Sequence, residues 1–316
     1  ARHVYQPLST ARWQADNALE RLQEWSDSEV PNRTRLMATA AAYGGYSYTL
    51  LGEGMCRAAF DREAPLEPDA IFRRAEERFT TAIEMASQAD ASEIENMARV
   101  GRARALLNLG EYSAALDDAE QVPVGFVRTA SYSGVDPSTE NRVYTMNRRD
   151  LLASVEAPYR NMTFEGEDDP RVQVTDLGVV GPGSEVDIWA AEKYSGIDSP
   201  IPVATWEEAA LIEAEAALQA NDDTDRAVQI INTLHDRAGL PDFQSSDAQE
   251  IMDQIIYERR AELFLEGHHL MDMKRYDLPL DPPPGEPFRF GGLYGDQTCF
   301  PLPAVEYRNN PNASGS

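Results

Sequence analysis

Apolar side chains recur at intervals of three and four residues through the Ala-rich first 122 residues, which is the spacing of one face of an α-helix. The clearest case follows Pro68, where Ile71, Ala75, Phe79 and Ile83 are separated by mostly charged positions. Prolines, glycines and short polar stretches interrupt the pattern and mark the breaks between helices. We therefore predict four helices in this block, over residues 8–26, 31–51, 68–88 and 93–121.

Residues 123–203 have a different pattern, rich in proline and glycine, in which only a short helix over residues 147–157 is predicted. A long irregular segment of this kind is usually either functional or disordered. This one carries many aromatic side chains, among them Tyr132, Tyr144 and Trp189, which is atypical of a disordered chain. We expect a loop-rich functional region with short β-rich pieces.

Helical spacing returns over residues 204–276, and a Pro- and Gly-rich tail, 277–316, is expected to be loop with one or two short strands. Two segments, Ala103–Leu116 with a turn at Gly110 and Trp206–Gly239, resemble tetratricopeptide helix pairs. They are not neighbours at the tandem period of about 34 residues, so a simple repeat array is excluded. The predicted fold is mainly α, with tetratricopeptide-like helix pairs, an irregular loop-rich half and little β.

Charge narrows the classes of partner. Among 316 residues there are 54 Asp and Glu against 28 Lys and Arg, a formal net charge of -26. This charge repels phosphate backbones and anionic lipid headgroups, so nucleic acid and polybasic membrane contacts are disfavoured. Lys193 and Lys274 are the only lysines. Two explanations stay open: an Arg-biased genome, or a halophilic acidic surface on which dense carboxylates hold water and cations.

Cys56 and Cys299 are the only cysteines, and they lie far apart without the spacing of a metal site. They are either two free thiols or one long-range disulfide in an oxidising compartment. No window approaches the roughly 18 apolar residues that a membrane span requires. Because the sequence starts at Ala1 with neither Met nor a signal peptide, we expect a processed or trimmed form.

No motif predicts an enzyme, since metalloprotease, serine-hydrolase and nucleotide-binding patterns are all missing from the sequence. His268 and His269 are adjacent, and neighbours on a helix point about 100° apart, so structural histidines are favoured over a shared metal ion. The acidic run at residues 165–169 lacks a calcium-loop pattern and is expected to be solvated. We predict no catalytic residue, no metal and no cofactor.

The most informative stretch is Ile255–Tyr276, which the spacing predicts to be one helix. Along it, Glu258, Arg259, Glu262 and Glu266 lie three or four residues apart beside an apolar stripe. Paired Arg and Glu that partly enter a core favour a structural ion-pair network of these four residues over a catalytic role.

The same stretch carries a resemblance to a known family. Glu258–Arg275, ERRAELFLEGHHLMDMKR, resembles the Glu-Arg-Arg-x-Glu-Leu and Glu-Gly-His-Arg-x-x-Asp-Leu-x-Arg signature of SusD/RagB-type proteins. The chain is short for that family, and His235 and His269 stand where Arg is usual. Other segments resemble the family in the same order over most of the chain: Tyr43–Gly52, Ala103–Val122, Asp168–Arg171, Lys193–Tyr194, Ile201–Leu218, Ile230–Gly239, Phe300–Pro303 and Asn309–Pro311.

The resemblance implies one SusD-like domain, with a helical scaffold at residues 8–122 and 204–276 and a ligand region at 123–203. It implies a protein that is not an enzyme, held at the bacterial outer-membrane surface by a lipid on an N-terminal Cys absent from this sequence. Such a protein captures a nutrient, commonly an oligosaccharide, and delivers it to a SusC-like TonB-dependent transporter. Export also favours a disulfide between Cys56 and Cys299.

No ligand residue transfers from the signature, because the family's ligand contacts lie on variable loops. Sugars present CH faces that stack on aromatic rings, and hydroxyls that pair with carboxylates, amides and arginine. We therefore nominate aromatic residues expected in loops or at helix ends, together with two polar partners: Tyr46, Tyr48, Glu53, Arg57, Tyr132, Tyr144, Trp189 and Tyr194.

Two other classes of function compete with this interpretation. An intracellular helical-repeat adaptor would keep both thiols free and would lack an export signal. A glycan-active enzyme would use carboxylates that cannot be singled out among 54 acidic residues.

Overall fold

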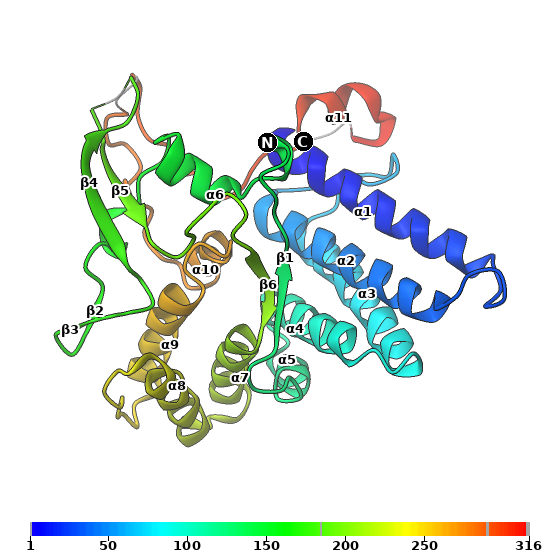
Figure 1. Ribbon diagram of the computed structural model, residues 1–316, viewed down its shortest axis with the longest axis horizontal. Coiled ribbons are helices and arrows are strands. Elements are labelled where there is room, and N and C mark those ends of the chain that lie inside the picture. Colours follow the sequence, from blue (N-terminus) through cyan, green and yellow to red (C-terminus); the bar gives the residue numbers. More distant parts are fainter. Residues whose placement is uncertain (1, 184, 289–290, 314–316) are drawn as a thin grey trace. The chain divides into compact units, whose positions relative to one another are not determined.

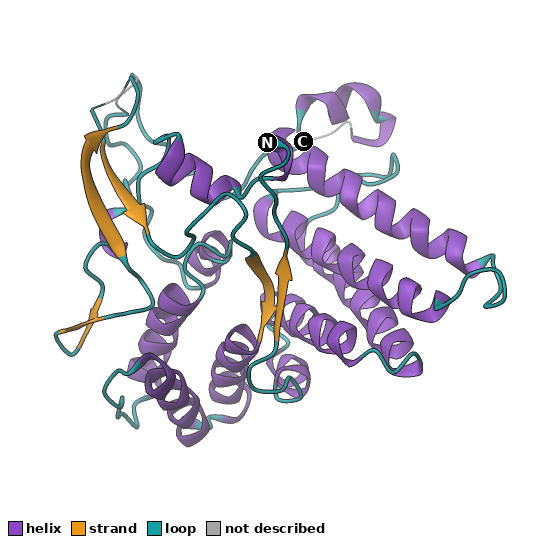
Figure 2. Cartoon of the chain, viewed as in Figure 1, coloured by secondary structure: helices purple, strands orange, loops and turns teal. Residues whose placement is uncertain are grey.

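The computed structural model describes residues 2–183, 185–288 and 291–313 (Figure 1). Helices dominate and the strands are short, which confirms the expected mainly α fold with little β (Figure 2). The chain divides into two compact units, Ala1–Pro123 with His269–Ser316, and Val124–His268. The expected scaffold grouped residues 8–122 with 204–276, whereas this division assigns most of the later helices to the second unit.

The first unit is built from helices that pack against their neighbours in the chain, α1 on α2, α2 on α3, α3 on α4 and α4 on α5 (Figure 1). Pro68 occupies the first turn of α3, where its missing N–H costs nothing. The five helices are α1 (Arg2–Gln23), α2 (Arg33–Gly54), α3 (Pro68–Gln88), α4 (Ser92–Asn108) and α5 (Tyr112–Ala119).

Glycines let these helices approach one another closely. The fully buried Phe79 ring of α3 lies against Gly45 of α2 and Gly101 of α4. A Cβ at Gly101 would lie 2.3 Å from the Phe79 ring, and one at Gly45 would lie 2.7 Å from it. Gly52 meets Phe72 in the same way, at 2.7 Å. These positions therefore require glycine for space.

The predicted helix over residues 93–121 is two helices, α4 and α5, separated at Gly110. Gly110 has a φ of 73°, a left-handed conformation that glycine adopts without steric cost. The single-helix prediction was wrong here, whereas the predicted helix pair turning at Gly110 was right.

The C-terminal tail returns to the first unit. After α10 (His269–Arg275) it carries α11 (Ala304–Asn309), so the expectation of loop with short strands missed this helix. Cys56 and Cys299 form a disulfide with an S–S distance of 2.03 Å. Beside it, the Cys56 N–H donates to the Phe300 carbonyl at 2.9 Å and the Phe300 N–H donates to Gly54 at 2.8 Å.

The second unit contains three longer helices, α7 (Trp206–Asn221), α8 (Thr224–Ala238) and α9 (Ala248–Glu262). Each begins at a side chain that accepts a free backbone N–H of the first turn. The caps are Thr205, which accepts from the Glu208 N–H at 3.0 Å, and then Asp223 and Asp247.

Strands of the second unit pair two by two, all antiparallel. The longest ribbon pairs Val174 with Ala191 and Asp176 with Trp189, with an irregularity before Val180. The pairs are β1 (Val127–Ala130) with β6 (Ile201–Thr205), β2 (Thr163–Phe164) with β3 (Glu167–Asp168), and β4 (Val174–Val180) with β5 (Asp187–Ala191).

The short helix predicted over residues 147–157 was wrong for most of its length. The helical turns are α6 (Arg142–Tyr144) and a π-helical turn over Thr145–Arg149. Beyond them the backbone pairs with β5, since the Val155 N–H donates to the Trp189 carbonyl at 3.0 Å. Pairing with a distant strand therefore replaces the local helix.

The segment Ile255–Tyr276 was predicted to be one helix, and this prediction was wrong. Helix α9 ends at Glu262, and α10 begins at His269. Between them Leu265 and Gly267 have φ values of 59° and 88°, which an α-helix cannot contain.

Candidate functional site

The eight nominated ligand residues divide between the two units. Tyr46, Tyr48, Glu53 and Arg57 belong to the first, and Tyr132, Tyr144, Trp189 and Tyr194 to the second. Each group is therefore described by itself.

Tyr46 and Tyr48 lie inside the helical stack and are 5% and 3% exposed. The Tyr46 hydroxyl donates to the Met97 carbonyl at 2.9 Å, and the Tyr48 hydroxyl donates to Asp16 at 2.9 Å. Burial and the nearby Asp16 carboxylate raise the pKa of Tyr48 to about 12. Their nomination is corrected, because rings whose surface is already covered by the core have none to offer a sugar.

Glu53 is also a core residue. Its carboxylate accepts from the Arg104 Nε at 2.7 Å and from the Arg104 Nη2 at 2.6 Å, while Asn108 donates to it at 2.9 Å. A buried carboxylate with all these partners is a structural ion pair, which corrects its nomination as well. Arg57 is half-buried and lies 3.7 Å from Glu67.

Trp189 is half-buried on β5, and a polar side chain fixes its strand. The Asn147 amide donates to the Trp189 carbonyl at 3.0 Å, and its oxygen accepts from the Ala191 N–H at 2.8 Å. The Arg160 guanidinium lies 4.8 Å from the centre of the Trp189 ring. The indole packs against a buried cluster made of Val155, Tyr159, Met162, Val172, Ala191, Ala261 and Phe264.

Tyr194 and Tyr132 form a second aromatic position in the same unit. Tyr194 is 5% exposed, and its hydroxyl donates to the Leu265 carbonyl at 3.3 Å. Burial, the Glu266 carboxylate and the neighbouring Tyr132 raise the pKa of Tyr194. Tyr132 is half-buried, which raises its own pKa and leaves part of the ring accessible. Tyr194 is therefore a buried neighbour, which corrects its nomination as a ligand contact, and Tyr132 is the ring with accessible surface.

Tyr144 is half-buried at the end of α6, where its N–H donates to the Asn141 side chain at 3.0 Å. Asn141 also donates to the Ser199 carbonyl at 2.9 Å. The same asparagine thus joins the Tyr144 helix to the loop that follows Tyr194. Three nominated aromatics, Tyr132, Tyr144 and Trp189, keep accessible surface within one unit.

The charged residues of the signature helix do form ion pairs, with a partner that the sequence analysis did not name. Arg171 donates through Nη1 to Glu258 at 2.5 Å and to Glu262 at 3.1 Å. It also makes a bidentate pair with Asp169, at 2.9 and 2.7 Å. Burial raises the pKa of Glu262, although Arg171 acts in the opposite direction.

His235 completes this network. Its ring is fully buried, with Nε2 2.8 Å from Glu258 and Nδ1 2.6 Å from the Pro241 carbonyl. Burial alone would lower the pKa of His235, but Glu258 and the Pro241 carbonyl outweigh it and raise the pKa. Both ring nitrogens face acceptors, so the protonated imidazolium satisfies both.

Two members of the predicted network lie elsewhere. Glu266 follows the break after α9 and pairs with Lys193 at 2.6 Å, apart from the Arg171 ion pairs. Arg259 is buried on α9. The Asp168-Asp-Pro-Arg171 motif contains the cation that pairs with Glu258. Sequence analysis did not predict this pair because the two residues are 87 positions apart.

The described residues include no group of three or more His, Cys, Asp or Glu arranged to hold a metal ion. His268 is buried 3.9 Å from Glu208. Within the same described part of the chain, no helix is long and apolar enough to cross a membrane.

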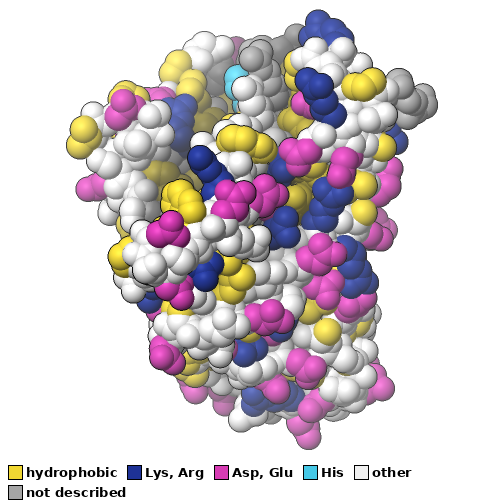
Figure 3. Space-filling model, turned by 90° about the vertical axis from the view of Figure 1, so that its right-hand side faces the viewer, with side chains coloured by type: hydrophobic (Ala, Val, Ile, Leu, Met, Phe, Trp, Pro, Cys, Tyr) yellow, Lys and Arg dark blue, Asp and Glu magenta, His cyan; other side chains and the backbone are white. Residues whose placement is uncertain are grey.

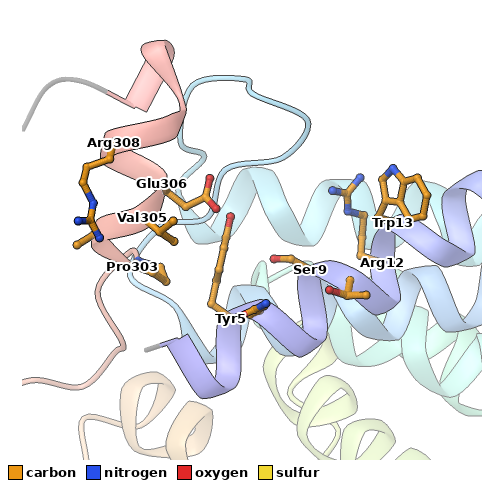
Figure 4. Close-up of a pocket in the computed structure, with 11 residues that line it drawn as sticks. Tyr5, Ser9, Arg12, Trp13, Pro303, Val305, Glu306 and Arg308 are labelled. Carbon is orange, nitrogen blue, oxygen red and sulfur yellow. The ribbon is translucent and has the colours of Figure 1, made fainter.

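A groove of about 760 Å³ lies between α1 and α11 in the first unit (Figure 4). Tyr5, Arg12 and Trp13 line it from α1, and Val305 and Glu306 line it from α11. Sequence analysis missed it because α11 lies in the tail that was predicted to be loop. On the face shown in Figure 3, acidic and basic side chains are interspersed.

Comparison with known proteins identifies the fold. Residues 207–312 match the sequence model of the SusD family. A SusD superfamily protein from Parabacteroides distasonis shares the fold with a TM-score of 0.70 at 14% identity, covering 98% of this chain and 83% of that one. A SusD-like carbohydrate-binding protein from Bacteroides vulgatus has a TM-score of 0.68 at 15% identity, with 98% of this chain and 82% of that one covered. A laminarin-binding SusD-like protein has a TM-score of 0.68 at 16% identity, with 88% of this chain and 78% of that one covered.

These matches identify a SusD-like helical protein with an irregular half. The chain shares the SusD fold, and residues 207–312, which contain the signature segment, match the SusD family model. No curated protein sequence matches it.

Proposed function

We propose that this protein binds oligosaccharides and delivers them to a SusC-like TonB-dependent transporter at the cell surface. The observation that carries the proposal is the fold shared over most of its length with SusD-like proteins described as binding carbohydrate and laminarin. The match of residues 207–312 to the SusD family model supports the same class of function. The transporter and an N-terminal lipid anchor in the outer membrane follow from the family resemblance and are part of the proposal.

The proposed ligand surface is the loop-rich part of the second unit. Trp189, Tyr132 and Tyr144 offer partly accessible aromatic faces, which suit the CH faces of a sugar ring. Arg160 lies over the Trp189 ring and supplies N–H donors next to it for ligand hydroxyls. Asn147 makes two hydrogen bonds to the backbone of the tryptophan strand, at Trp189 and at Ala191, so the indole is oriented before the ligand arrives.

Isothermal titration of the full chain with laminarihexaose, cellohexaose, maltohexaose and xylohexaose tests the proposal. We expect at least one of these neutral sugars to bind, and Trp189→Ala to weaken that binding by about tenfold or more. Trp25→Ala is the matched control, because Trp25 is 48% exposed and belongs to the other unit.

Trp189→Phe guards against a folding artefact, since it keeps an aromatic ring on the buried cluster and should retain most of the affinity. Unchanged affinity in a folded Trp189→Ala variant would show that the site is misplaced. Release of shorter sugars during incubation would contradict the expectation that the protein is not an enzyme. Co-purification with a SusC-like TonB-dependent barrel tests the delivery step.

A further inference from the structure

The groove between α1 and α11 has the features of a second ligand site within the first unit. Its volume of about 760 Å³ falls in the range of small-molecule pockets, about 300–1,000 Å³. All its lining residues come from Tyr5–Trp13 and Pro303–Arg308. The site is therefore complete within one unit.

The Arg12 side chain carries a buried polar atom without a partner. Arg12 is only 4% exposed, and its terminal nitrogens reach Asp61 at 2.6 and 3.3 Å. Its Nε–H, however, is buried with no hydrogen-bond acceptor in the protein. A buried donor left unsatisfied costs about 1–3 kcal/mol, so this side of the groove is not optimised for stability alone.

An acceptor and an aromatic platform complete the lining. The Glu306 carboxylate points towards the Tyr5 hydroxyl, and Trp13 lies further along α1 (Figure 4). Burial raises the pKa of Glu306, as expected of a carboxylate turned towards an apolar groove. The Trp13 indole is 52% exposed, an unusual position for so large an apolar side chain.

The balance of charge selects the class of ligand. Arg12 is already neutralised by Asp61, and Arg308 on α11 offsets Glu306. The part of α1 that faces the groove, Gln6 to Trp13, contains no acidic residue, and its other polar groups there are amide and hydroxyl. Such a lining offers donors, acceptors and an apolar face without a net charge to attract an ion.

We propose that the groove between α1 and α11 is a second binding site for a neutral oligosaccharide, with Trp13 as the stacking platform and Glu306 as a hydroxyl acceptor. This inference rests on the proposed function, since it names a further site for the same class of ligand. A shallow depression beside the groove, lined by His3, Gln6, Thr10 and Gln14, continues the uncharged polar surface along α1. A linear sugar chain could follow it.

Titration of the full chain with the same four hexasaccharides tests the second site. We expect a binding stoichiometry of two for the sugar that binds, with one site lost in Trp13→Ala and weakened about tenfold in Glu306→Gln. Trp25→Ala is again the control, because Trp25 is as exposed as Trp13 but lies outside the groove. Since both substituted side chains are at least partly exposed, the variants should melt close to the wild type.

The outcomes separate the two proposals. If a sugar binds once per chain, and both Trp13→Ala and Glu306→Gln bind it as the wild type does, the groove is not a sugar site while the proposed function stands. If Trp189→Ala leaves one site intact that Trp13→Ala removes, both proposals hold. If none of the four sugars binds, the proposed function is overturned, and the second site is overturned with it.

Discussion

Arg171 and Glu258 are 87 positions apart in sequence, yet the Arg171 Nη1 lies 2.5 Å from the Glu258 Oε2. The Glu258 side chain is fully buried, and its other oxygen lies 2.8 Å from the His235 Nε2. The loop that carries Arg171 and two helices of the second unit therefore meet at one carboxylate. The signature segment thus has a structural function, which several of the following predictions test.

Removing Arg171 should destabilise the protein strongly. Arg171→Met leaves the buried Glu258 and Asp169 carboxylates without their principal cation, and breaking a buried pair costs about 3–5 kcal/mol. Urea unfolding measures the change in free energy. Arg73→Met is the control, because Arg73 pairs with Glu76 at 2.9 Å on an exposed surface, where such pairs contribute about 1 kcal/mol or less. Equal losses in both variants would contradict a buried network.

Stability should fall at alkaline pH through His235. The folded state raises the pKa of His235 above its unfolded value of about 6.5, so this group contributes stability that is full below that value. The contribution is lost as the pH rises through the folded pKa. His235→Gln should flatten the fall in the urea midpoint as the pH rises above about 6.5, and the difference between variant and wild type isolates this residue. Parallel curves would exclude its role.

The disulfide should contribute measurably to the stability of the first unit. It joins residues 243 positions apart, and native disulfides typically contribute about 2–5 kcal/mol. A Cys56→Ser, Cys299→Ser double variant should melt below the oxidised wild type, and dithiothreitol should lower the wild type to the same level without changing the variant. A reductant effect of equal size on the variant would point to another cause.

Neighbouring glycines of α2 should respond in opposite ways to alanine. Gly45→Ala places a Cβ 2.7 Å from the Phe79 ring and should cost about 1–3 kcal/mol through overpacking. At Gly44 the nearest atom, the Ala15 Cβ, is 3.5 Å away, which is an ordinary contact. Gly44→Ala should therefore stabilise the helix by up to about 1 kcal/mol. The melting temperatures of the two variants test this difference. Equal destabilisation by Gly44→Ala and Gly45→Ala would argue against close packing at Gly45.

Much of the fold was accessible from local patterns. Residues 68–88 were predicted as a helix with the observed bounds, because apolar spacing and Pro68 both report on the helix itself. The pair around Gly110 was recognised for the same reason. The failures, at residues 147–157 and at Leu265, occurred where distant pairing or backbone turns replaced a locally plausible helix.

The candidate site was less accessible. Tyr46, Tyr48 and Glu53 have residue types suited to sugars. Packing among α1 to α4 buries these side chains, and their polar atoms form hydrogen bonds within the protein. A side chain's type states what it is able to bind, whereas its accessibility depends on every neighbour in the folded chain.

The sequence by itself determined the family signature, the mainly helical class and the presence of charged side chains beside an apolar stripe, because these depend on residue order over a few helical turns. Only the tertiary structure decided that Arg171 is the partner of Glu258, that Cys56 meets Cys299, and that Trp13 faces a groove closed by α11. The physical reason is that the periodicity of one segment reports its own faces, while a contact between distant segments is fixed by the packing of the whole unit.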